Sequence, residues 1–71
     1  MVRCKFICNS VTSRGDEANR VHEAEFTPVT CGSKENEAFF RWTPGGALRL
    51  SVLREQHFVP GREYYVEIHD A

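Results

Sequence analysis

The most constraining feature of this sequence is the stretch at residues 58–68, Phe-Val-Pro-Gly-Arg-Glu-Tyr-Tyr-Val-Glu-Ile. Its Pro-Gly pair predicts a turn, because proline fixes φ and glycine accepts positive φ. Strict alternation follows, with Tyr64, Val66 and Ile68 on one side and polar residues out of phase with them. This period of two predicts a half-buried β-strand that needs neighbouring strands to pair with.

The rest of the chain supplies those neighbours as short segments with the same period. We expect an all-β fold, a small five-stranded antiparallel sheet or partly open barrel, with strands near residues 2–8, 20–30, 38–42, 47–53 and 62–68. One or two single-turn helical connectors are expected, at 33–36 under a Ser33 cap and at 54–57. Beyond Asn9 the first strand loses phase, which predicts either a bulge near Asn9 and Ser10 or burial on both faces. The alternation places a core at Phe6, Phe26, Leu48, Leu50, Tyr64, Val66 and Ile68.

Seventy-one residues predict a single β domain over residues 1–71 with a small core. Small domains are usually reinforced by disulfides, a metal or oligomerisation. Three cysteines, an odd number, without a secretory leader favour reduced thiols in a reducing compartment. No stretch approaches the about 20 apolar residues that a membrane-spanning helix needs, so no membrane is expected. Oligomerisation is therefore the expected reinforcement.

Composition and motifs argue against several classes of function. Nine basic residues balance ten acidic ones, giving a net charge of −1, which does not favour nucleic acid as a partner. Cys4 and Cys8 on one strand would lie about 13 Å apart at a rise of about 3.3 Å per residue, too far for one zinc ion. The sequence contains no hydrolase, metalloprotease or phosphate-loop motif. We expect neither a metal, nor a cofactor, nor enzymatic activity.

One cluster stands out as a candidate ligand site, in the aromatic and glycine-rich stretch at residues 39–46. A ring can stack on a base, arginine offers a planar fork to phosphate, and glycine N–H groups approach anions closely. The alternative is that the rings of Phe39, Phe40 and Trp42 serve the core or a subunit interface, and that Pro-Gly-Gly is only a hairpin turn. The candidate ligand-binding residues are Arg41, Trp42, Thr43, Gly45 and Gly46.

Four blocks in register also resemble a group of small, largely uncharacterised proteins encoded by tailed bacteriophages. The resemblance covers nearly the whole chain and implies a viral protein made in the host bacterial cytoplasm. It brings no catalytic residue. The blocks are Phe6-x-Cys8-x-Ser10-Val11-Thr12, Gly32-Ser33-x-Glu35-Asn36-x-x-Phe39, Thr43-Pro44-x-Gly46-x-Leu48-x-Leu50 and Phe58-x-Pro60-Gly61-x-Glu63-Tyr64-Tyr65-Val66.

For a phage protein of this kind two functions remain open. The first is a non-enzymatic homo-oligomeric module that binds and sequesters a host component, with a nucleotide signal of bacterial immunity as a candidate ligand. The second is a virion structural or assembly accessory protein, which would be virion-associated. The arginine-containing cluster favours the first function.

Overall fold

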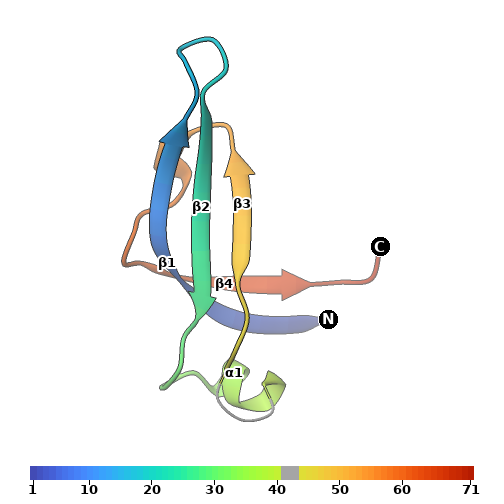
Figure 1. The fold of residues 1–71 in the computed structure, drawn as a ribbon. Helices are drawn as coiled ribbons and strands as arrows, with labels where there is room; N and C mark the ends of the chain where they lie inside the picture. Colours follow the sequence, from blue (N-terminus) through green and yellow to red (C-terminus); the bar gives the residue numbers. More distant parts are fainter. Residues whose placement is uncertain (41–43) are drawn as a thin grey trace.

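Four antiparallel strands form one sheet in the order β3-β2-β1-β4, as Figure 1 shows. This computed structural model describes residues 1–40 and 44–71. The two long strands, β1 (Val2–Arg14) and β2 (Val21–Pro28), make the centre of the sheet. The two short strands, β3 (Leu48–Val52) and β4 (Glu63–Ile68), make its edges. The all-β antiparallel class predicted from the alternation is confirmed.

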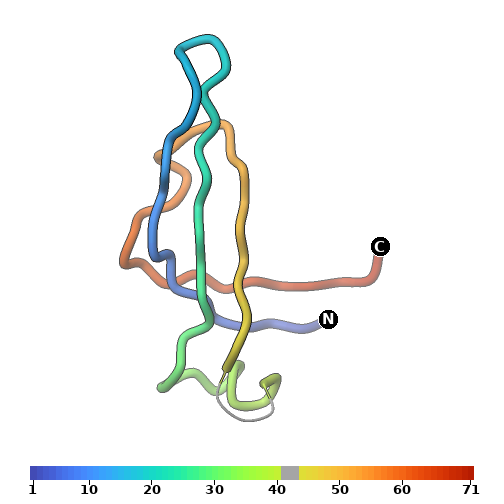
Figure 2. Tube along the Cα trace, viewed as in Figure 1, coloured from blue at the N-terminus to red at the C-terminus, as the bar shows by residue number. Residues whose placement is uncertain are grey.

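The sheet curls into a half-barrel because β1 serves two partners in turn. Its first half pairs with β4, from Val2 opposite Ile68 to Ile7 opposite Glu63. Its second half pairs with β2, and the register shifts between Cys8 and Ser10. A bulge at this point bends the strand, as bulges do. The β4 end of the sheet consequently runs across the direction of β2 and β3, and both termini lie on one side of the molecule (Figures 1 and 2).

Of the two explanations offered for the loss of phase, the bulge near Asn9 and Ser10 is therefore the one that the structure shows, and the predicted turn before the last strand is confirmed. Gly61 adopts φ of 93°, and its N–H donates to the Cys8 carbonyl at 2.8 Å. The Cys8 N–H donates in turn to the Arg62 carbonyl at 2.9 Å. The turn thus extends the β1–β4 pairing to residues that precede Glu63, the first residue of β4.

The prediction of a third strand at residues 38–42 is wrong for its described part, and the sheet has four strands rather than five. Residues 34–39 form the helix α1 (Lys34–Phe39), capped by the Ser33 side chain. The lysine, glutamates and alanine of this run favour a helix, and the Ser33 cap stabilises its first turn. The connector is thus a six-residue helix and not a single turn. The second connector contains a 3₁₀ turn, η1 (Glu55–His57).

The core lies on the concave face of the half-barrel, where the alternation places it. Cys4, Phe6 and Cys8 from β1 and Ala24 and Phe26 from β2 are buried. Part of the predicted core packs against these residues while staying half-exposed, namely Leu48, Leu50, Tyr64 and Val66.

The prediction that Ile68 belongs to the core is wrong, since its side chain is 54% exposed. Ile68 pairs with Val2 at the outer end of the β1–β4 ribbon. That ribbon extends past the end of β2 (Figure 1), so no strand of the described residues covers this position. Period-two alternation identifies the face of a residue but does not show how far along a strand the cover reaches.

Candidate functional site

The concave face carries an apolar groove, which is the strongest candidate for a binding site. A cavity of about 350 Å³ lies between the β3 and β4 ends of the curled sheet. This volume falls at the lower end of the range for small-molecule sites. We use "apolar groove" for its lining residues, which are Phe26, Leu48, Leu50, Phe58, Tyr64, Tyr65 and Val66.

Three mutually packed rings form the floor of the apolar groove. The ring of Phe58 meets that of Phe26 edge to face, with centroids 5.0 Å apart, and that of Tyr64 in the same way at 5.3 Å. Aromatic pairs prefer this geometry. The Tyr64 hydroxyl accepts a hydrogen bond from the Val59 N–H at 2.9 Å, which fixes the chain beside Phe58. The connection from β3 to β4 must cross β2 and β1, and Phe58 anchors it to the concave face.

Five of the seven groove residues, all except Phe58 and Tyr65, were predicted as core and not as a site. Leu48 and Leu50 alternate along β3, and Tyr64 and Val66 alternate along β4, so each pair faces the inside of the curl. These two strands are the edges of the sheet, and no described strand pairs with them on their outer sides. Their apolar side chains therefore stay half-exposed instead of being sealed in a closed barrel.

Only part of the predicted ligand cluster can be located. Arg41, Trp42 and Thr43 lie outside the described residues. Gly45 and Gly46 are exposed, and Gly46 adopts φ of 137°, which residues with a side chain rarely adopt. The two glycines lead directly into Leu48, so the described end of the cluster adjoins the apolar groove in the chain.

A second, smaller cavity adjoins the same cluster through Pro44. Its volume is about 200 Å³, and its lining comes from the β2–α1 connection, from α1 and from Pro44. Cys31 is exposed there, whereas Ser33 and Asn36 are buried. Its described lining contains no basic side chain, so it offers an anion little attraction. The lining residues are Val29, Thr30, Cys31, Ser33, Asn36, Glu37 and Pro44.

Asn36 joins this region to the sheet, a role that the sequence did not reveal. Its side-chain oxygen accepts from the Lys5 N–H at 2.6 Å, and its amide donates to the Lys5 and Val29 carbonyls at 2.7 and 2.9 Å. The Ser33 hydroxyl accepts from the Asn36 N–H at 3.3 Å and thereby caps α1. Asn36 thus bonds the backbone N–H and C=O of Lys5 on β1, just beyond the point where β2 ends. Because its polar atoms are bonded in this way, its side chain can be buried, with 1% exposure.

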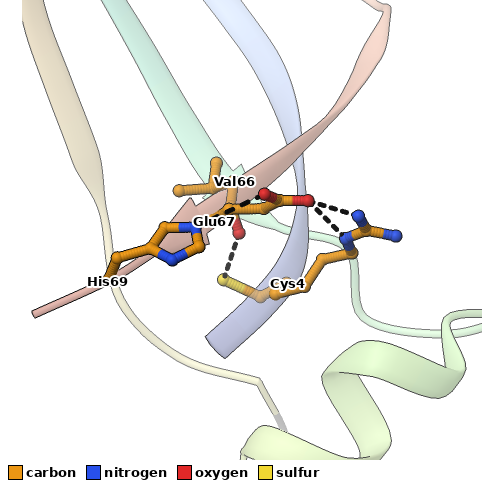
Figure 3. Close-up of polar contacts among 5 residues, drawn as sticks. Cys4, Val66, Glu67 and His69 are labelled. Atoms are coloured by element: carbon orange, nitrogen blue, oxygen red, sulfur yellow. Dashed lines mark hydrogen bonds and ion pairs between the residues drawn. The ribbon is translucent and has the colours of Figure 1, made fainter. Parts of the chain in front are cut away.

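The convex face, in contrast, is charged and carries a small polar network near the chain ends (Figure 3). The Arg3 guanidinium on β1 pairs with the Glu67 carboxylate on β4, and His69 approaches the other Glu67 oxygen at 3.5 Å. Hydrogen bonding and charge from Arg3 hold the pKa of Glu67 below its ordinary value. Since Arg3 and Glu67 are both solvent-exposed, this network resembles an ordinary surface ion pair and not a catalytic dyad.

Cys4 lies just inside this network, on the concave side. Its thiol contacts the Val66 carbonyl at 3.8 Å, and burial raises the pKa of that thiol. A raised pKa disfavours the reactive thiolate. Cys4 is therefore a packing residue and not a nucleophile, and Cys8 is buried in the same core.

Within residues 1–40 and 44–71, no three His, Cys, Asp or Glu side chains gather closely enough to hold a metal ion. The expectation that no metal is bound stays a prediction. Among the described helices, none is long and apolar enough to cross a membrane.

Comparison with known proteins provides no family for this chain. No protein-family model, no curated protein and no solved structure matches it. The functional argument consequently depends on the geometry of the site itself.

Proposed function

We propose that this chain is a non-enzymatic binding module that sequesters a host component in its apolar groove. One observation carries the proposal: the half-exposed groove of about 350 Å³ with three rings packed edge to face at its floor. Such a surface favours a flat or branched apolar group over a charged one. We further propose that it acts as a homo-oligomer of a phage-encoded protein in the host bacterial cytoplasm.

A nucleotide-like ligand has two parts, a base and a phosphate, and each would contact a different part of this site. Its base would lie against the apolar groove, where aromatic rings offer stacking surface. Its phosphate would approach the exposed backbone at Gly45 and Gly46, two and three residues before Leu48 in the chain. Arg41, the predicted source of positive charge, lies outside the described residues, and its role stays a prediction.

Calorimetric titration against a panel of cyclic and linear nucleotides tests the proposal. Leu50→Gln places a polar amide in the groove at nearly constant length, whereas Ser51→Gln changes the next residue, whose side chain faces outward on the same strand. Full burial of a leucine side chain contributes about 1.5–3 kcal/mol, and Leu50 is half-exposed, so the lower end of that range applies and Leu50→Gln should weaken binding roughly tenfold. Ser51→Gln should bind as the wild type does. Null heats for every nucleotide would refute the nucleotide ligand, and equal binding by both variants would refute the groove as its site.

A virion or assembly role is the second candidate, favoured by a different observation. Both edge strands of the described sheet are open, and several apolar side chains are exposed at the rims, including Leu53 at 81% and Tyr65 at 57%. Open edges and exposed apolar side chains are typical of surfaces that bind other chains. Recovery of the protein in purified virions, at a fixed ratio to the other virion proteins, would favour this role over sequestration.

A further inference from the structure

The convex face of the sheet carries charges whose sign alternates from strand to strand. Arg49 on β3 pairs with Glu25 on β2 at 3.3 Å, and Arg14 on β1 pairs with Glu23 on β2 at 3.4 Å. Arg3 and Lys5 on β1 pair with Glu67 and Glu63 on β4. In the strand order β3-β2-β1-β4 the paired charges are thus positive, negative, positive and negative. The sheet ends with a positive edge strand on one side and a negative edge strand on the other.

The backbone of β4 has hydrogen-bonding groups available on its outer side. Cys8 exchanges hydrogen bonds with the β4 side of the sheet, and the Lys5 carbonyl accepts from Val29 on the β2 side. Alternation along β1 therefore turns the backbone of Phe6 and Cys4 toward Tyr64 and Val66, their partners on β4. The N–H and C=O groups of the residues between them, Glu63, Tyr65 and Glu67, consequently face the outer edge.

The same reasoning applied across β2 reaches the outer edge of β3. Ile7 faces β2, so its partner Thr27 faces β1 and the neighbouring Phe26 faces β3. Phe26 pairs with Leu48, and the intervening residues Arg49 and Ser51 therefore turn their backbone groups outward. Within the described chain, these outward groups have no strand beside them.

We propose that β4 of one copy pairs antiparallel with β3 of the next copy, head to tail. This pairing continues both regularities of the sheet, the antiparallel direction and the alternation of charge, with Arg49 facing the Glu63 and Glu67 of its neighbour. Pairing of β4 with another β4 would instead set glutamate against glutamate, and like charges opposite each other are destabilising. Pairing of β3 with another β3 would leave every negative edge open.

The proposed joint also completes the candidate site. Leu48 and Leu50 of one copy would continue the row made by Tyr64 and Val66 of the other, so two copies would line one apolar surface. A head-to-tail contact closes into a ring when the rotation between copies is suitable and grows into a filament otherwise. The curl of this sheet supplies a rotation at each joint, which favours a ring. This inference rests on the oligomeric part of the proposed function.

Edge-blocking prolines test the inference. Ser51→Pro removes an outward N–H from β3, and Tyr65→Pro removes one from β4; an edge strand tolerates proline where the N–H faces outward. Native mass spectrometry at micromolar concentration should show a wild-type oligomer and each variant alone as a monomer. An equimolar mixture should form a dimer containing one of each, because only one β3 edge and one β4 edge remain to pair.

Each other outcome overturns the inference in a recognisable way. If one variant alone forms a homodimer, the copies pair through like edges. If both variants keep the wild-type mass, the oligomer uses another surface, and oligomerisation stands without this mode of pairing. If the wild type is monomeric, the proposed pairing between copies is refuted and the strand edges are left for a different partner. Nucleotide binding can still be measured separately.

A second pair of variants keeps the test valid if a proline variant fails to fold. Arg49→Glu and Glu67→Lys change only exposed side chains, and circular dichroism checks that both keep the fold. Each alone should dissociate at least tenfold more readily than the wild type, and the mixture should regain the wild-type mass because the complementary edges alternate again. Unchanged dissociation of both variants would overturn the charge argument and the proposed pairing with it.

Discussion

Replacement of Asn36 by alanine should destabilise the protein by more than any surface substitution. The change removes three hydrogen bonds of 2.6–2.9 Å and leaves the Lys5 N–H and the Val29 carbonyl without the amide. Each bond contributes about 0.5–1.5 kcal/mol net, and an orphaned buried group costs about 1–3 kcal/mol. We expect a loss of about 2–4 kcal/mol, a fall in melting temperature of roughly 10–25 °C for a domain of this size.

Urea unfolding followed by far-ultraviolet circular dichroism measures this loss, at one fixed protein concentration because oligomers link stability to concentration. Asn9→Ala is the matched control. The Asn9 amide donates one bond to the Thr27 hydroxyl at 2.9 Å, but it does so in solvent. We expect its effect to stay within about 0.5 kcal/mol. If Asn36→Ala cost no more than this control, the argument that Asn36 ties α1 to the sheet would be refuted.

Asn36→Asp separates the loss of the donor from the loss of the side chain. The carboxylate keeps an acceptor for the Lys5 N–H but sets an oxygen against two carbonyl oxygens. Burial and these carbonyls should raise the pKa of the introduced carboxyl. The variant should therefore be less stable than Asn36→Ala at neutral pH. Since a raised folded pKa contributes stability only at low pH, the variant should recover relative to Asn36→Ala on acidification.

Two further predictions concern titratable groups. Native alkylation should modify Cys31, which is exposed, while Cys4 and Cys8 react only after urea unfolding; mass spectrometry showing three adducts on the folded protein would contradict their burial. Arg3→Gln should destabilise the protein slightly at pH 7, because the Glu67 pair stabilises above the ordinary carboxyl pKa of 4.5 and is lost as pH falls through the lowered folded value. Urea midpoints of variant and wild type should converge at pH 3, and a constant gap would argue against this pair as the cause.

The sequence by itself determined the strand class, the faces of the strands and the turn chemistry. Alternation at Tyr64 and Val66 identified the concave face of β4, and the Pro-Gly pair located the turn before it. The loss of phase beyond Asn9 left two explanations open, a bulge or burial on both faces, and the structure shows the bulge. These features are local, because the side-chain period and the φ preferences of proline and glycine act within a few residues.

Tertiary structure alone decided which alternating residues are buried, and so where the candidate site lies. Leu48, Leu50, Tyr64 and Val66 carry a core pattern, yet they line an open groove because their strands became sheet edges. Ile68 shows the same pattern and is exposed because the β1–β4 ribbon extends past its cover. Burial depends on strand order and curl, which arise from contacts between residues far apart in the chain.

The helix at residues 34–39 also combines a local sequence signal with contacts that only the tertiary structure provides. Its start was indicated locally by the Ser33 cap, but aromatic residues at its end favoured a strand. Asn36 holds this helix against the sheet, because its side chain bonds Lys5 on β1 and Val29 just after β2. The sequence around Asn36 gives no sign of this role, because only the assembled sheet presents the backbone groups that its side chain binds.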